Sequence, residues 1–132
     1  MIATTIEQSK KLIELGLDEK SADMVYQCIG FSIHSTKGYH DFKYRLRTKE
    51  DHEHSHAEEF DVSAWSLSAL LKMLPFPMIC QEMFGGGIVW RCYTEFLEDG
   101  IQHMSLIHED PIDAVFDCVV WMLNGGFIGK GK

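Results

Sequence analysis

The sequence lacks most of the features that mark specialised classes of protein. Its 132 residues include only three prolines. No apolar run approaches the roughly 20 residues that a membrane-spanning helix needs. Basic residues are also few, because 12 Lys and Arg stand against 20 Asp and Glu and give a net charge of −8. Such an acidic surface repels phosphate backbones, so we expect neither direct nucleic-acid binding nor a membrane partner.

The four cysteines form no C-x-x-C pair, and each lies among apolar neighbours. They are Cys28, Cys80, Cys92 and Cys118. The first residues, Met1–Thr5, contain neither the basic nor the apolar region of a secretory signal. These observations predict reduced thiols and a cytoplasmic location, and they favour this over disulfide bonds. The hydrophobic content of 45% predicts a single domain over residues 1–132 with its own core.

Two segments in the first half carry helix signals. One helix is expected over about Thr5–Leu15, with Thr4 and Glu7 forming a capping box at its start. The other is expected to begin after Ser66, which suits the N-cap position, and to end before Pro75. Both have apolar residues spaced for one buried helix face.

A third helix is the best-marked element of the chain. Asp110 suits its N-cap and Pro111 its first position, and the Gly125-Gly126 pair is expected to end it. This helix is apolar over most of its surface, which is typical of a helix buried on more than one side. Its cover is either the chain's own sheet alone or that sheet together with a second subunit. The residues of this possible interface are Phe116, Val120 and Trp121.

Alternation of apolar and polar residues predicts the strands. Residues 29–33 and 42–46 flank a glycine-containing loop and predict a β-hairpin with one buried face. Three more strands are expected at Ile79–Phe84, Ile88–Phe96 and Ile101–Ile107. The elements together predict an α+β fold, in which three helices pack on an antiparallel sheet of three to five strands. Residues 48–61 are expected to form a mobile polar loop, and residues 126–132 a flexible tail.

The polar segment 48–61 contains the sharpest local motif, the histidines His52, His54 and His56. Histidines two residues apart on an extended chain point to the same side, and imidazole binds zinc, nickel or copper. The motif therefore favours, as one alternative, a metal-binding module or metal-dependent enzyme with a transition metal as cofactor. The other interpretation is a solvated loop that happens to be rich in histidine, and no other cofactor is expected.

Recognised catalytic motifs are missing from the sequence, including G-x-S-x-G, H-E-x-x-H and the dinucleotide-binding glycine pattern. The C-terminal residues 126–132 match the G-x-x-x-x-G-K spacing, but they follow a helix instead of a strand and open no helix. The Gly85-Gly86-Gly87 run is typical of a turn or bulge. A pocket near Trp65, Trp90 and this run would suit a second alternative, a small-molecule-binding domain.

Three segments together resemble a family of short, uncharacterised proteins from bacterial mobile elements and prophage-like regions. They are Ala22-Asp23-Met24, the AWSLSALL segment Ala64–Leu71, and Asp110–Ala114 leading into Val119–Leu123. The resemblance brings no activity and no site residues. With the missing catalytic motifs, it favours a non-enzymatic accessory or protein-interaction domain of a mobile genetic element, working with a protein partner or as a homodimer.

Overall fold

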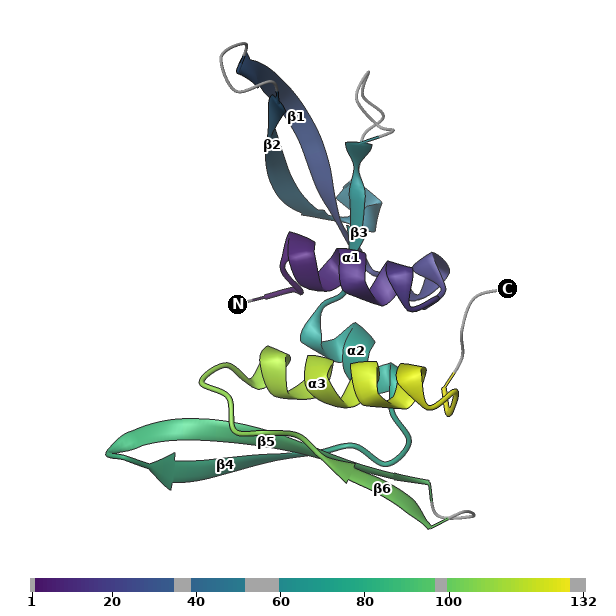
Figure 1. The fold of residues 1–132 in the computed structure, drawn as a ribbon, viewed down its shortest axis with the longest axis vertical. Helices are drawn as coiled ribbons and strands as arrows, with labels where there is room; N and C mark the ends of the chain where they lie inside the picture. Colours follow the sequence, from purple (N-terminus) through teal and green to yellow (C-terminus); the bar gives the residue numbers. More distant parts are fainter. Residues whose placement is uncertain (1, 35–38, 52–59, 97–99, 129–132) are drawn as a thin grey trace.

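The computed structural model of the chain describes residues 2–34, 39–51, 60–96 and 100–128 (Figure 1). In chain order its elements are α1 (Ile6–Glu14), η1 (Glu19–Ser21), β1 (Met24–His34), β2 (Tyr39–Thr48), η2 (Lys49–Asp51), β3 (Val62–Ala64), α2 (Leu67–Met73), β4 (Met78–Phe84), β5 (Gly87–Phe96), β6 (Ile101–Met104) and α3 (Pro111–Asn124). The α+β class and the antiparallel pairing that the sequence predicts are therefore confirmed.

The described strands form two antiparallel sheets of three strands each, with the orders β2-β1-β3 and β4-β5-β6. The sequence pattern predicts a single sheet, because hairpins are local features whereas the division of strands between two sheets depends on tertiary packing. The chain leaves the first sheet after β3, forms α2, and begins the second sheet at β4. Figure 1 shows the three helices between the two sheets, as the middle layer of the molecule.

The start of α1 differs from the expected capping box. The N-cap is Thr5, whose hydroxyl accepts a hydrogen bond from the Gln8 backbone while the Gln8 side chain accepts one from the Thr5 backbone. The predicted pair of Thr4 and Glu7 is therefore wrong. Thr4 is fully buried instead, and its hydroxyl accepts a hydrogen bond of 3.1 Å from the Trp65 backbone. Thr4 therefore makes a tertiary contact with Trp65 and does not cap the helix.

The caps of α2 and α3 are as the sequence predicts. The Ser66 hydroxyl accepts from the Ala69 backbone at the start of α2, and the Asp110 carboxylate accepts from the Ile112 backbone at the start of α3. Pro111 occupies the first position of α3, and Gly125 ends it. No helix in the described ranges is long and apolar enough to cross a membrane.

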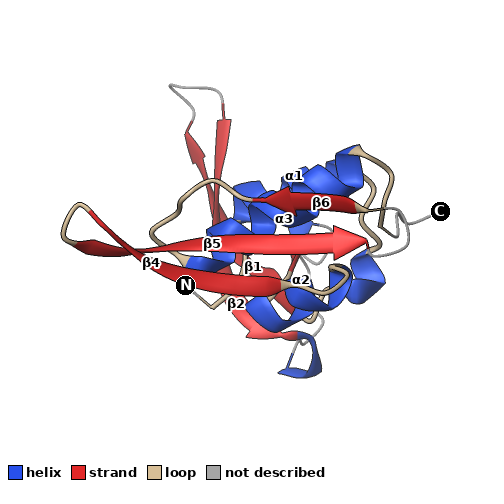
Figure 2. Ribbon diagram, turned by 90° about the horizontal axis from the view of Figure 1, so that it is seen from below, coloured by secondary structure: helices blue, strands red, loops and turns tan. Residues whose placement is uncertain are grey.

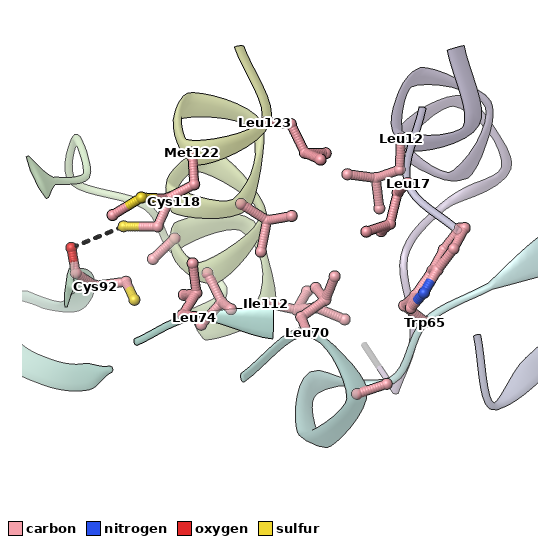
Figure 3. Packing of buried hydrophobic residues seen from close by; sticks show 14 of the residues in the cluster. Leu12, Leu17, Trp65, Leu70, Leu74, Cys92, Ile112, Cys118, Met122 and Leu123 are labelled. Carbon is pink, nitrogen blue, oxygen red and sulfur yellow. Dashed lines mark hydrogen bonds between the residues drawn. The ribbon is translucent and has the colours of Figure 1, made fainter. Parts of the chain in front are cut away.

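Helix α3 lies in the centre of the core. One side packs on the β4-β5-β6 sheet, and the other side packs on α2 and on the α1 region (Figure 3). Seven of its residues are buried: Ile112, Ala114, Val115, Cys118, Val119, Met122 and Leu123. Elements of the same chain therefore account for a helix that is apolar on two sides, and a second subunit is not needed to explain it.

The hairpin of β1 and β2 contains a bulge that the sequence does not reveal. The strands pair Cys28 with Tyr44 but Gly30 with Lys43, which leaves Ile29 without an opposite residue. Ile29 begins the first strand of the predicted hairpin and is expected on its buried face. That prediction is wrong, because the Ile29 side chain is 54% exposed. An extra residue in one strand turns the following side chains toward the other face.

Two further segments fall partly outside the described residues. Of the polar loop predicted over 48–61, residues 52–59 lie outside the described ranges, and so do residues 129–132 of the tail predicted over 126–132. Within the described part of that tail, Phe127 and Ile128 pack against the core.

Candidate interaction surface

The histidines of the predicted metal site, His52, His54 and His56, lie outside the described residues. The metal-binding hypothesis therefore stays a prediction. Among the residues that are described, no group of three or more His, Cys, Asp or Glu side chains is arranged to hold a metal ion.

The α3 residues of the predicted interface, Phe116, Val120 and Trp121, are half-buried and pack against the core. The Trp121 indole stacks on His103, with ring centroids 4.5 Å apart and planes within 9°, and it also stacks on Phe127 at 5.3 Å. Neighbours from the same chain thus already contact much of Trp121. An interface at these three residues stays a prediction.

A cluster of polar side chains around Asp117 on α3 is not predicted from the sequence. One carboxylate oxygen lies 3.2 Å from Nε2 of His108 and accepts a hydrogen bond of 3.1 Å from the Leu106 backbone. The other oxygen lies 3.6 Å from Nε2 of His103. These contacts hold β6 and the segment after it against α3. No spacing rule predicts such a cluster, because its members meet only after the sheet and the helix have packed.

The buried thiols of Cys92 and Cys118 also meet between the sheet and α3. Cys118 Sγ donates to the Cys92 carbonyl oxygen at 3.2 Å (Figure 3), and all four cysteines of the chain are free. The hydrogen bond with Cys92 and burial raise the pKa of the Cys118 thiol. A thiol that stays protonated is a poor nucleophile, so Cys118 packs the core instead of offering a reactive sulfur.

The features suggested for a small-molecule pocket lie in different places. Trp65 is fully buried, and its Nε1 donates a hydrogen bond of 2.9 Å to the Ser21 hydroxyl. Gly85 and Gly86 form the two-residue turn between β4 and β5, with φ of 58° and 83°. Both glycines need this left-handed conformation, which suits a type I′ hairpin turn. The glycine run is thus a turn, as one interpretation of the sequence holds.

A cleft of about 340 Å³ lies elsewhere, where β1 begins and β2 ends. Its lining residues are Ala22, Asp23, Thr48, Lys49 and Glu50. The Asp23 carboxylate accepts hydrogen bonds from the backbone and the hydroxyl of Ser66, and Lys49 Nζ donates to the Glu19 carbonyl oxygen. Two of the polar side chains of this cleft are therefore engaged: Asp23 joins the start of β1 to the start of α2, and Lys49 joins η2 to η1.

The most distinctive surface belongs to the second sheet. Among the residues whose side-chain exposure is described, which leaves out residues 31–42, 51–59 and 96–99, ten large hydrophobic side chains are exposed, and seven of them lie between residues 76 and 106. We call these seven the hairpin surface. They are Phe76, Met78, Met83, Phe84, Ile88, Met104 and Leu106. Scattered exposed hydrophobic residues are ordinary, but a concentration on one part of a molecule marks a site of interaction.

The β4–β5 hairpin extends beyond α3, as Figures 1 and 2 show from two directions. Met83 and Ile88 pair across the two strands on the same face as Ile79 and Trp90, which pack against the core. At the tip no helix covers this face, and the exposed fractions of Met83 and Ile88 are 74% and 52%. Phe84 on the opposite face is 66% exposed. Both faces of the tip therefore offer apolar side chains to a partner.

Phe76 stands at the other end of β4 in a strained conformation. Its φ of 44° lies in the left-handed region, which bulky residues rarely adopt, and its side chain is 67% exposed. Pro75 and Pro77 flank it. Strain of this kind is concentrated at functional sites, and here it directs an aromatic ring toward solvent beside the first residue of the strand.

No protein-family model, curated protein or solved structure matches this chain. Function is therefore inferred from the surface itself. The segments that carry the resemblance to mobile-element proteins meet in the core, since Ala22, Leu70 and Ile112 belong to the same buried cluster. These contacts give the residues structural roles, and membership of that family stays a prediction.

Proposed function

We propose that this chain is a non-enzymatic protein-interaction domain, an accessory protein of a mobile genetic element, and that it binds its partner through the hairpin surface. The observation that carries the proposal is the concentration of exposed apolar side chains on β4, β5 and the segments beside them. Aromatic residues and methionine are enriched in the buried centres of protein interfaces, and they make up five of the seven members.

The charges on this surface suit a protein partner. Glu82 and Arg91 form an ion pair of 3.1 Å on the outer face of the sheet, which leaves Glu95 as the only other charged residue of β4 and β5. These two strands carry a net charge of −1, from one Arg against two Glu, whereas the whole chain carries −8. Interface centres are typically depleted of unpaired charge in this way, while charges elsewhere keep the free protein in solution.

Two groups that would be candidates for catalysis have structural roles, which supports a non-enzymatic function. Asp117 binds the Leu106 backbone and His108, and Cys118 donates to the Cys92 backbone in the core. We further propose that the domain works in the cytoplasm, where its four free thiols would stay reduced.

A double substitution at the hairpin tip tests the proposed function. Met83→Lys with Phe84→Lys should reduce recovery of the bound partner, whether a second copy or another protein, by about tenfold or more. Both side chains are exposed, so the stability of the fold should change by no more than about 0.5 kcal/mol. The measurement is quantitative co-purification of a tagged chain from its native host, with a differently tagged copy present.

Ile2→Lys with Ile29→Lys is the matched control. It adds the same two charges and removes two side chains that are 69% and 54% exposed, but both lie away from the second sheet. The control should keep every partner of the unmodified chain. Equal recovery of the same partners by the tip variant and the control would contradict the proposed function.

A further inference from the structure

We propose that the partner is a second copy of this chain, and that the two copies pair their β4 strands antiparallel, with Gln81 opposite Gln81 of the second copy. This inference rests on the proposed function and names the partner of the same surface. It joins two three-stranded sheets into one continuous sheet of six strands. The result is a two-fold symmetric dimer, in which each copy offers the same strand.

Strand β4 is an open edge without the usual protection. Sheet edges are normally blocked by lysine, proline, a bulge or a very short strand. β4 has seven residues in unbroken register with β5, and its only charged residue, Glu82, is paired with Arg91. β2, an edge of the other sheet, carries Lys43, Arg45 and Arg47 and lies opposite the bulge of β1. The chain thus protects β2 and leaves β4 open.

The backbone of β4 directs hydrogen-bonding groups outward. Trp90 exchanges backbone hydrogen bonds of 2.7 and 2.9 Å with His108, and the Cys92 carbonyl accepts one of 2.8 Å from Ser105. These bonds point away from β4. In an antiparallel ladder the residues opposite them, Gln81 and Ile79, therefore face the open edge with their N–H and C=O groups. Because the direction of the backbone groups alternates from residue to residue, the N–H and C=O groups of Met83 also face the open edge.

The sequence of β4 is complementary to itself in one register. With Gln81 at the centre, Met78 lies opposite Phe84 of the second copy, and Ile79 lies opposite Met83 of the second copy. In these two pairs an apolar residue meets an apolar one, and the outward N–H and C=O groups of Gln81 pair with those of Gln81 of the second copy. The remaining pair places Cys80 opposite Glu82 of the second copy. Of these side chains, Met78, Met83 and Phe84 are 57%, 74% and 66% exposed in the single chain.

The neighbouring symmetric registers fit less well. Centring the pair on Cys80 places Met78 opposite Glu82 and Ile79 opposite Gln81 of the second copy, so both large apolar pairs are lost. Centring it on Glu82 places two carboxylates directly opposite each other, which is destabilising. Sliding one strand past the other by a single residue is excluded. Residues whose N–H and C=O groups face the open edge would then lie opposite residues of the second copy whose groups face β5. The side chains therefore select Gln81 as the centre.

Charge at the junction permits two acidic chains to meet there. Each copy carries −8, which opposes association in general. At the paired strands, however, Glu82 is already neutralised by Arg91 of its own copy at 3.1 Å. Screening of the remaining repulsion by salt should therefore tighten the dimer, and the dissociation constant should fall as ionic strength rises.

Light scattering of the purified chain with reductant present tests the pairing. The unmodified chain should have twice its mass of 15.1 kDa, and Gln81→Pro should have the mass of one chain. Proline removes the outward N–H of Gln81 and places its ring where the second strand would pair, without removing a bond to β5. A dimer that persists in Gln81→Pro would overturn the proposal.

Gln102→Pro is the matched control on β6, the other edge of the same sheet. Gln102 lies opposite Glu95 and, by the same alternation, also directs its N–H outward. The same substitution at the same kind of position should leave the dimer intact. Loss of the dimer in both variants would show that proline disturbs the sheet generally, and it would count against pairing at β4.

A disulfide experiment tests the register independently of proline. In a Cys80→Ser background, chains with Met78→Cys are mixed with chains with Phe84→Cys and oxidised. Both positions direct backbone groups toward β5, so across the dimer they form a non-hydrogen-bonded pair with a Cα separation of about 4.5 Å, within reach of a disulfide. Cross-linked dimers should form in the mixture and not in either sample alone. Equal cross-linking in a single sample would overturn the register.

The outcomes separate this inference from the proposed function. If the unmodified chain has the mass of one copy up to the highest concentration tested, pairing of two copies is wrong. The proposed function would still stand if the Met83→Lys, Phe84→Lys variant lost a different protein from the host. If neither a second copy nor another protein depends on these residues, both proposals fail.

Discussion

Val119→Asp should prevent folding, at a cost of more than about 4 kcal/mol. Val119 is fully buried in the centre of α3, between the second sheet and the other helices. An aspartate there has no partner for its charge and must either bury a carboxylate or take up a proton, and both are unfavourable. Circular dichroism at neutral pH, followed by urea titration, measures the effect.

Val120→Asp is the matched control, because the neighbouring residue is half-buried. This variant should fold and lose less stability than Val119→Asp. Native-like stability of Val119→Asp would contradict the central position of α3. The control also examines the interface that the sequence suggests on α3, since loss of self-association in a folded Val120→Asp variant would favour that helix over β4.

Trp65→Ala should destabilise the fold by about 3–5 kcal/mol, which approaches the whole stability of many domains. Trp65 is the largest fully buried side chain and lies between the first sheet and α2. Its backbone pairs with Thr4, and its indole donates to Ser21. Urea unfolding followed by circular dichroism gives the change in the free energy of unfolding.

Trp65→Phe separates the volume of this side chain from its hydrogen bond. Phenylalanine fills much of the same space but leaves the Ser21 hydroxyl without the indole N–H, so the cost should be only about 1–2 kcal/mol. Equal costs for the two substitutions would mean that packing around Trp65 contributes little, against the position of this residue in the core.

Helix ends and hairpins could be predicted from the sequence because they depend on local chemistry. Ser66 and Asp110 cap their helices by bonds to residues two or three positions away, and the glycines at 85 and 86 form a turn by themselves. Where a distant contact competed, the local pattern failed. Thr4 looked like a cap, but Trp65, far along the chain, binds it in the core.

Tertiary packing decides three features that the local sequence does not show. They are the division into two sheets, the bulge at Ile29 and the elements that pack on α3. The sequence shows that α3 is apolar on two sides, but it does not show that α1 and α2 lie on the side away from the sheet. A second subunit was therefore a reasonable alternative at Phe116, Val120 and Trp121. In the structure α1, α2 and the second sheet cover the buried face of α3, and an interface at these half-buried residues stays a prediction.

The hairpin surface could not be predicted from alternation alone. The residues of β4 have the pattern of a half-buried strand, and whether a position is covered depends on where α3 begins relative to the tip of the hairpin. Ile79 near the base packs against the core, whereas Met83 on the same face of the strand is 74% exposed. Only the relative lengths of helix and hairpin separate these two residues.

Oxidation of methionine in the native host tests most directly whether the hairpin surface is occupied. An Ile29→Met variant supplies an exposed reference away from the second sheet, and Met122, which is fully buried, supplies a protected one. Peroxide oxidation of Met83 is compared with the residue-29 reference in host cells and in the dilute, isolated chain. We expect Met83 to oxidise several-fold more slowly, relative to this reference, in the cells. An unchanged ratio would show that nothing covers the hairpin surface and would contradict an interaction domain that works through it.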